Sequence, residues 1–278
     1  MNPMNEEEQK LADEIRTGIE AYAQKTYDDG HRSHLGASLI GHKCDRYLWF
    51  TFRWVYHHIH TGRMQRLFQT GHCEEIRIIR WLRGAGYQVE NEDLDGKQFR
   101  ISGVNGHFGG SIDGKAIIKD ELFLTEFKTN KTGPEFKAYF EIGMKANKAK
   151  HWAQTCVYGA KLQIKRVLYI CKNKDNDDLY IEIADLDHNH GYDMEQKANR
   201  IINSQEMPSR ISETPAFFEC KYCDYCDICH RNKPIEKNCR SCKNAYPVEN
   251  AEWKCGLYNA IIPKDQILVD KPCWNGVM

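Results

Sequence analysis

Hydrophobic positions recur with a helical period in the first third of the chain. Residues 6–25 predict an amphipathic helix whose apolar stripe consists of Leu11, Ile15, Ile19 and Tyr22. A second helical stretch begins near Ala37. A third covers residues 66–83, is ended by Gly84 and Gly86, and is expected to turn inward Leu67, Ile76, Ile79 and Leu82. Between the second and third stretches, the tract His57, His58 and His60 is expected to be a solvated loop or helix end, because short histidine tracts are weak indications of a metal site.

The period then changes from helical to alternating. Short strands separated by Gly, Asp and Asn are predicted at residues 87–90, 98–104, 110–118 and 122–128. Helices at 134–142 and 148–162, strands at 166–171 and 179–184, and a polar helix at 192–204 complete the pattern. From Pro208 onward the periodicity fades and cysteines become frequent. This order predicts a mixed α/β core with a metal-binding C-terminal tail.

Composition and charge argue against a membrane-spanning or exported protein and limit how an anionic partner can be bound. The 278 residues are 28% charged and 41% apolar, with 39 basic and 39 acidic side chains, which is enough to bury a core. Without a net charge, an anionic partner must be held by local patches. The sequence has no apolar run near the ~20 residues of a membrane span, and its acidic N-terminus does not resemble a signal peptide. We therefore expect a cytoplasmic protein without a membrane partner.

A predicted hairpin brings two carboxylates together. If Lys119 and Asp120 form a two-residue tip, residues whose numbers sum to 239 face one another, and Asp113 lies opposite Glu126. Facing side chains hold their Cβ atoms ~4.5–5.5 Å apart, so the two carboxylates repel unless a cation lies between them. Lys128 follows two residues after Glu126 and shares its face. Such a face suits Mg²⁺, which takes few carboxylates and keeps several waters.

The alternative is an exposed hairpin on which these charges are simply solvated. Two features favour a site. Gly109 and Gly110, just before the hairpin, permit a close backbone approach or a bend. The apolar residues around the charges leave few exposed positions and indicate that both faces of the strand are largely buried; they are Leu122, Phe123, Leu124 and Phe127.

These residues resemble the motif of the PD-(D/E)XK nuclease superfamily, here Asp113 and Glu126-Phe127-Lys128. Two further motifs resemble the branch that contains lambda-type exonucleases and RecB-like nuclease domains. They are Gly71–Glu75, which places Glu75 at the acidic ligand position, and Gln154–Tyr158, whose first and last side chains share one helical face. The resemblance implies a restriction-endonuclease-like core, in which helices flank a mixed central sheet.

The resemblance also implies roles for these residues. The ligands of Mg²⁺ or Mn²⁺ would be Glu75, Asp113, Glu126 and the backbone carbonyl of Phe127. Lys128 would orient or help deprotonate the attacking water and stabilise the developing charge on the phosphate. Gln154 and Tyr158 would position the substrate strand. Phosphate contacts of this kind do not read sequence.

Twelve cysteines are many for this length, and eight of them lie between Cys220 and Cys273. In a chain without an export signal, metal ligation is favoured over disulfides. Three of them have the spacing C-x2-C-x5-C, which resembles iron–sulfur nucleases of the AddB and CRISPR-associated types. The implied [4Fe–4S] ligands, one from before the core and three from after it, are Cys44, Cys220, Cys223 and Cys229. Cys226 makes an alternative zinc pairing possible.

The last four cysteines predict a second metal site. The knuckle Cys239-Arg-Ser-Cys242, with Cys255 and Cys273, matches a structural zinc tetrahedron, and His230 is a less favoured alternative ligand. By contrast, Cys73, Cys156 and Cys171 lie in periodic segments and are expected to be buried small apolar residues.

Basic residues around the hairpin form the best local patch for DNA, namely Lys128, Lys131, Lys137, Lys145, Lys148 and Lys150. An opposite wall is expected from Arg46, Arg53, Arg63 and Arg66 with Tyr47 and Trp54, although the same residues could cover the core instead.

The sequence thus predicts a metal-dependent DNA nuclease, in the first place an exonuclease, from bacterial or phage recombination and repair. A structure-specific or nicking endonuclease and a non-catalytic DNA-binding module are the alternatives. DNA ends are the expected partner. A second copy of this chain, in a homo-oligomer, or a recombination protein is a further expected partner. The expected division is a helical region at 1–60, a nuclease core at 61–205, an iron–sulfur segment at 206–234 and a zinc-ribbon-like module at 235–278.

Overall fold

A five-stranded mixed sheet forms the centre of the computed structural model, which describes residues 4–278. Its order is β2 (Gln88–Glu90), β5 (Gly114–Ile118), β6 (Glu121–Asn130), β7 (Arg166–Asn173) and β8 (Leu179–Asp185). Only β6 and β7 are parallel, so the chain must cross over between them, and it does so through two helices. These helices are α4 (Pro134–Asn147) and α5 (Ala149–Leu162). The predicted mixed α/β fold is confirmed.

The alternation of side chains along β6 gives the sheet two buried faces. Phe123 and Phe127 pack toward Ile78 and Ile79 of α3 (Gly62–Gly84). Residues of opposite parity, such as Leu124, join the larger core around α5, against which α6 (His188–Asn203) packs. Glu126 has the parity of Leu124, so the sequence places a carboxylate on a buried face of the sheet.

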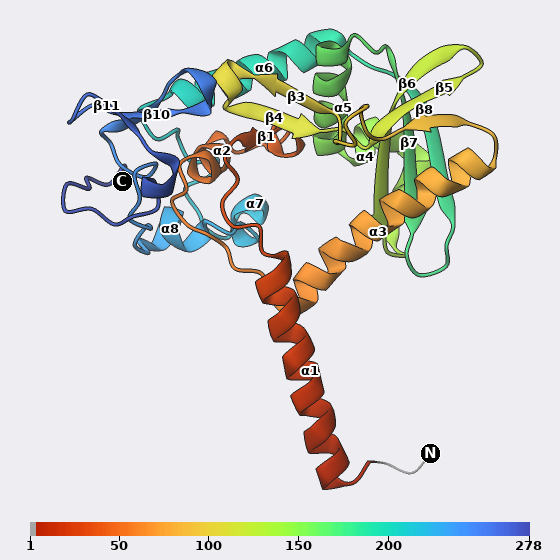
Figure 1. The fold of residues 1–278 in the computed structure, drawn as a ribbon, viewed down its shortest axis with the longest axis horizontal. Helices are drawn as coiled ribbons and strands as arrows, with labels where there is room; N and C mark the ends of the chain where they lie inside the picture. The colour runs from red at the N-terminus through yellow and green to blue at the C-terminus, as the bar shows by residue number, and fades with distance from the viewer. Residues whose placement is uncertain (1–3) are drawn as a thin grey trace.

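Smaller elements flank this core (Figure 1). A second sheet orders β1 (Leu35–Gly36), β4 (Phe108–Ser111) and β3 (Arg100–Gly103), and it lies beside the short helix α2 (Asp45–Phe52). The C-terminal part contains α7 (Phe218–Lys221), α8 (Cys226–Arg231) and a small antiparallel sheet of β9 (Ala245–Pro247), β10 (Trp253–Cys255) and β11 (Ala260–Ile262). The division into four regions stays a prediction.

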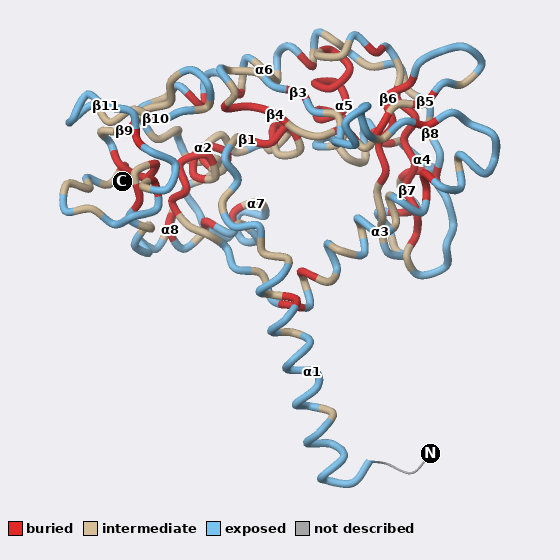
Figure 2. The backbone as a smooth tube through the Cα atoms, viewed as in Figure 1, coloured by how far each residue is buried: buried red, intermediate tan, exposed pale blue. Residues whose placement is uncertain are grey.

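The helix α1 (Glu6–Tyr27) projects away from the body, and its surface is almost entirely exposed (Figures 1 and 2). An Asn5–Glu8 capping box begins it. Its base crosses the start of α3, where a Cβ on Gly62 would lie 2.1 Å from the backbone oxygen of Glu20. None of the helices in residues 4–278 has the combination of length and hydropathy needed to cross a bilayer.

The position of α3 corrects two sequence predictions. Its first half leaves the body toward α1 (Figure 1), and Leu67 is exposed there. Ile76, in the second half, is exposed as well, so the prediction that these two residues face inward is wrong. Only the second half lies over the sheet, which buries Ile79 as predicted. Cys73 lies on the exposed side of this helix, so its predicted burial is also wrong, whereas Cys156 and Cys171 are buried.

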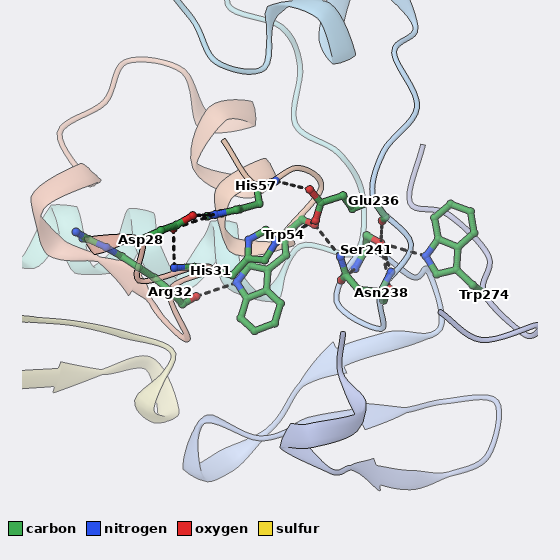
Figure 3. Close-up of polar contacts among 10 residues, drawn as sticks. Asp28, His31, Arg32, Trp54, His57, Glu236, Asn238, Ser241 and Trp274 are labelled. Atoms are coloured by element: carbon green, nitrogen blue, oxygen red, sulfur yellow. Dashed lines mark hydrogen bonds and ion pairs between the residues drawn. The ribbon is translucent and has the colours of Figure 1, made fainter. Parts of the chain in front are cut away.

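The histidine tract lies in the loop between α2 and α3, as predicted, but His57 is not simply solvated (Figure 3). Its Nε2 lies 3.0 Å from Asp28 Oδ2, and its backbone N–H donates to Glu236 Oε1 at 2.6 Å. Glu236 Oε2 also lies 3.0 Å from His31 Nε2, within hydrogen-bonding distance. These contacts join the end of α1 to the C-terminal cysteine-rich segment.

The strand β4 passes close to α5 at the predicted glycine pair. A Cβ on Gly110 would lie 2.5 Å from Tyr158 Oη, and one on Gly109 would lie 2.7 Å from the carbonyl oxygen of Ile101. Neither distance is compatible with a side chain, so Gly110 allows the approach of Tyr158 to β4, and Gly109 allows the close approach of Ile101 on β3.

We expect Gly110→Ala to lower the free energy of unfolding by about 1–3 kcal/mol, because the added methyl group overpacks the contact with Tyr158. Tyr158→Phe in the same chain should recover part of this loss by removing the hydroxyl. Thermal unfolding followed by circular dichroism measures both. Gly71→Ala is the control, since nothing lies within 4 Å of its added Cβ; an equal loss there would contradict the steric explanation.

Candidate active site

The hairpin of β5 and β6 has the predicted register. Gly114 faces Thr125 and Ile118 faces Glu121, and the tip residues Lys119 and Asp120 have φ of 49° and 63°. Asp113 immediately precedes β5, and its Oδ2 accepts a hydrogen bond from the backbone N–H of Phe127 at 2.7 Å. The carboxylate of Asp113 is therefore tied to β6 beside Glu126.

Lys128 brings its ammonium between the two carboxylates. Its Nζ forms an ion pair with Glu126 Oε1, lies 3.8 Å from Asp113 Oδ2 and donates to the carbonyl oxygen of Phe127 at 3.1 Å. Glu126 is completely buried, and neither of its oxygens accepts a hydrogen bond of normal geometry from residues 4–278. Asp113, Glu126, Lys128 and the carbonyl of Phe127 thus meet at one place.

Glu75 reaches the same site from α3. Burial raises the pKa of Glu75 to about 7, and the nearby charges of Asp113 and Glu126 add to this effect while Lys128 opposes it. Burial likewise raises the pKa of Glu126 to about 7, with Lys128 opposing and Asp113 adding. Burial alone would lower the pKa of Lys128, but Glu126 and Asp113 outweigh it and raise the pKa. The charges of three carboxylates and one ammonium thus act on one another at this place.

Gln154 and Tyr158 share the inner face of α5. Gln154 Nε2 donates to Tyr158 Oη at 3.2 Å, and both side chains are buried. Burial raises the pKa of Tyr158, and Glu126 is the next cause, so this hydroxyl lies within the field of the carboxylates.

A buried chain of hydrogen bonds beside the site was not predicted. His151 Nδ1 lies 2.8 Å from Tyr169 Oη, which lies 2.8 Å from Tyr139 Oη. Tyr169 is the β7 neighbour of Glu126. Burial lowers the pKa of His151 to about 3, and Lys128 is the next cause, so this ring is neutral. The only sequence signal was the proximity of His151 to Gln154 on the same helix.

The predicted lysine patch and the predicted opposite wall have different outcomes. Lys131, Lys137, Lys145 and Lys150 are exposed on and around α4 and α5. The prediction of a DNA-binding wall opposite the lysines is wrong in part, because Arg46, Arg53 and Trp54 are buried and offer no surface to DNA. Buried backbone carbonyls and aromatic rings hold these side chains instead.

The first cysteine group consists of Cys44, Cys220, Cys223 and Cys229, and it lines one small cavity together with Cys226 and His230. Arg46 bridges this group to the segment before α7, since its Nε donates to Pro208 O at 2.7 Å and its Nη1 to Cys229 Sγ at 3.5 Å. The structure therefore brings the upstream cysteine, at the N-cap of α2, to the three downstream ones. Cys226 remains beside them as an alternative ligand.

The C-terminal cysteine group consists of Cys239, Cys242, Cys255 and Cys273. Burial raises the pKa of the Cys239 thiol, and the other three thiols of the group add to the rise while Lys271 opposes it. The backbone N–H of Cys242 donates to the carbonyl of Cys239 at 3.2 Å, closing the knuckle turn. Within residues 4–278, however, no group of three or more His, Cys, Asp or Glu side chains that could hold a metal ion is found, either among the cysteines or among the carboxylates.

Comparisons with known proteins give a distant likeness only. No family model matches the chain, and no curated protein matches it. The chain is similar to the crystal structure of SSO0001, with 16% identity, 77% of this chain and 96% of that chain covered, and a TM-score of 0.43. It is also similar to an alkaline exonuclease, LHK-Exo of Laribacter hongkongensis.

For the exonuclease in complex with dAMP, the identity is 17%, the coverage 61% of this chain and 86% of that chain, and the TM-score 0.42. For a second structure of this exonuclease, the identity is 16%, the coverage is 62% of this chain and 87% of that chain, and the TM-score is 0.41. TM-scores below 0.5 do not establish a common family, so the geometry of the carboxylate site has to carry the functional proposal.

We expect Glu126→Gln to raise the free energy of unfolding of the metal-free protein near pH 8 by about 1–3 kcal/mol. Because the pKa of Glu126 is raised from 4.5 to about 7, the folded chain binds more protons than the unfolded chain between these values. Stability therefore falls as pH rises through this window, and the loss is complete above it. Urea unfolding at about pH 5 and pH 8 measures the effect.

Glu90→Gln is the matched control, because Glu90 is exposed on β2. It should leave stability nearly unchanged at both pH values. A lower stability of Glu126→Gln near pH 8 would show that the charged form of Glu126 is favoured by the fold, contrary to the shift described above.

Proposed function

We propose that this chain is a Mg²⁺- or Mn²⁺-dependent nuclease that hydrolyses phosphodiester bonds in DNA, acting as an exonuclease. The observation that carries the proposal is the cluster of the buried Glu126 with the half-buried Asp113 and Lys128, in which Lys128 pairs with Glu126 Oε1 and Glu126 Oε2 has no hydrogen-bond donor among residues 4–278. Unpaired buried carboxylate oxygens are costly, and a bound cation supplies the missing partner.

The residues fit a hard divalent ion. When all three carboxylates are ionised, Glu75, Asp113 and Glu126 would carry three negative charges against the one positive charge of Lys128, which would leave two for a divalent cation to balance. Oxygen ligands, including the nearby carbonyl of Phe127, suit Mg²⁺. Such an ion supplies Lewis-acid stabilisation of the phosphate and a lowered pKa of bound water.

The protein's own residues have distinct tasks in this proposal. Lys128 is protonated beside Glu126, so it donates to the attacking water or to a phosphate oxygen and holds it against the site. Tyr158 and Gln154 are buried, so in this structure they support the carboxylates from behind, and their contact with the substrate strand stays a prediction. The exposed lysines of α4 and α5 bind the DNA backbone without reading its sequence.

The cysteines support two structural metal centres in the same proposal. The first cysteine group fits a [4Fe–4S] cluster because four thiols from both sides of the core surround one cavity. The C-terminal cysteine group suits Zn²⁺ because it offers four thiols, two of them at the ends of a closed C-x2-C turn. In both groups the support is the donor set alone, since no group of three ligands able to hold a metal ion is found within residues 4–278. A role in recombination or repair, a homo-oligomer and a cytoplasmic location belong to the proposal as well.

We expect Asp113→Ala to lower the rate of DNA hydrolysis by at least about a thousandfold while DNA affinity changes little, because metal stabilisation of the phosphate is worth several kcal/mol. Release of nucleotides from labelled linear duplex and single-stranded DNA, with and without Mg²⁺, measures the rate. Asp95→Ala, in an exposed loop, is the control.

Persistence of activity in Asp113→Ala would contradict the proposed ligand set. Cleavage of closed circular duplex at the rate of linear duplex would replace the exonuclease with an endonuclease. Tight DNA binding without hydrolysis in any divalent ion would leave a non-catalytic DNA-binding module.

We expect anaerobically purified protein to contain about four irons and one zinc per chain, with broad absorption near ~400 nm. Cys220→Ser should remove the iron and the absorption and lower solubility, but keep the zinc. Elemental analysis and an optical spectrum check both. Zinc alone, in the wild-type chain, would contradict the iron–sulfur centre.

A further inference from the structure

The apolar stripe of α1 packs against no other part of residues 4–278. Each of its four side chains is between 50% and 62% exposed, and Ala23 alone in this helix is buried; the four are Leu11, Ile15, Ile19 and Tyr22. They follow one another at intervals of four, four and three residues, so they form one line along the helix. A continuous apolar line on a helix that projects from the body indicates an interaction surface (Figure 2).

The contact of α1 with α3 uses a different side of the helix. Gly62 lies against the backbone of Glu20, and Glu20 pairs with Arg66 at 2.6 Å. At 3.6 residues per turn, Glu20 and Ala23 point roughly 90–140° away from the middle of the stripe. Tyr22, at the same level of the helix, stays 62% exposed. A partner helix can therefore lie along the stripe down to the base of α1.

The free part of α1 gains little stability from the rest of the chain. Helices in proteins owe most of their stability to the packing of an amphipathic face, and most of this face is unpacked. Gly18, in the middle of the helix, disfavours the helical state further. Nothing lies within 4 Å of a Cβ added there, so no contact within residues 4–278 requires a glycine. Packing against a partner would supply the missing stabilisation.

The charges along α1 are divided between its two ends. Residues 6–14 contain five acidic side chains and one lysine, a net charge of −4. The base carries +3, because Arg16, Lys25 and Glu20 are joined there by two arginines from the first half of α3, Arg63 and Arg66. The free end of one arm is therefore complementary in charge to the base of another copy.

This division favours an antiparallel pair of arms over a parallel one. Glu7 and Lys25 lie about five turns apart, so they are on the same flank of the stripe. In an antiparallel pair about a two-fold axis, each flank faces the same flank of the partner, and the acidic first turn lies beside the last turn of the other helix. A parallel pair would instead place the two acidic ends side by side.

We propose that α1 is a dimerisation arm, which pairs along its stripe with α1 of a second copy of this chain in the antiparallel direction. Leu11 of one copy then faces Tyr22 of the other, and Ile15 and Ile19 meet at the two-fold axis. The two bodies lie at opposite ends of a two-helix connection roughly 33 Å long. This inference specifies the surface of the homo-oligomer named in the proposed function, and it requires neither DNA hydrolysis nor a bound metal.

Sedimentation equilibrium of the full-length chain measures the dissociation constant of the dimer. A reducing buffer is needed, because Cys73 is exposed and could cross-link two copies. Ile15→Lys should raise the dissociation constant by at least about a hundredfold, since the two-fold axis removes two buried side chains at once. Thr17→Lys is the matched control, because Thr17 is exposed on the opposite side of α1 and receives the same charge; it should change the constant by less than about threefold.

A charge exchange tests the direction of the pair. Glu7→Lys and Lys25→Glu should each raise the dissociation constant by about threefold to tenfold at low salt, because each places like charges together twice in one dimer. Their combination restores opposite charges and should recover most of the wild-type affinity. Circular dichroism of each variant checks that the helix is retained.

A chain that remains monomeric up to about 100 µM would overturn the proposal, as would a dimer that Ile15→Lys leaves intact. Tighter association of Glu7→Lys would overturn the antiparallel direction, because only parallel arms are relieved by neutralising their free ends. The nuclease assay is read separately. An intact dimer that hydrolyses no DNA would contradict the proposed function alone, and a monomer that hydrolyses DNA would contradict this inference alone.

Discussion

Burial of the Glu126 carboxylate inside the sheet is the constraint on which the site depends. A charge in the middle of a strand must be compensated, and Lys128 on the same face supplies one cation. Asp113 and Glu75 then add two further negative charges rather than relieving the first. Burial and this crowding raise the pKa of both Glu75 and Glu126 to about 7, so the fold favours their protonated forms. In the proposed function a divalent cation would favour the charged forms instead, and ligand binding and folding would be coupled.

The C-terminal part follows the same rule with the opposite sign. There, Arg53 and Arg240 leave two positive charges unpaired among aromatic side chains. Because buried charges of either sign are costly, hydrogen bonds to backbone carbonyls and contacts with aromatic faces have to stabilise these guanidiniums.

The sequence predicted what depends on local chain geometry and missed what depends on long-range packing. The register of Asp113 and Glu126 follows from a two-residue turn, so it was accessible from the sequence. The neighbourhood of Tyr169 and Glu126 depends on a parallel pairing across the α4–α5 crossover, which no local pattern defines. Arg53 was assigned to the surface because arginines are seldom buried, and only the surrounding tryptophans reveal its position.

The short helix α2 connects the first cysteine group with the small C-terminal sheet, through the hydrogen bond of Arg53 to Ala245. Cys44 is its N-cap and Arg53 its C-cap, so the eight residues between them span roughly 12 Å. A thiolate at the N-terminus and a guanidinium at the C-terminus both interact favourably with the helix dipole. If a metal centre holds Cys44, loss of that metal frees the N-terminal end of α2, whose residues Leu48 and Trp49 belong to the main core. The metal would then stabilise the core that carries β6, although it does not lie among the carboxylates.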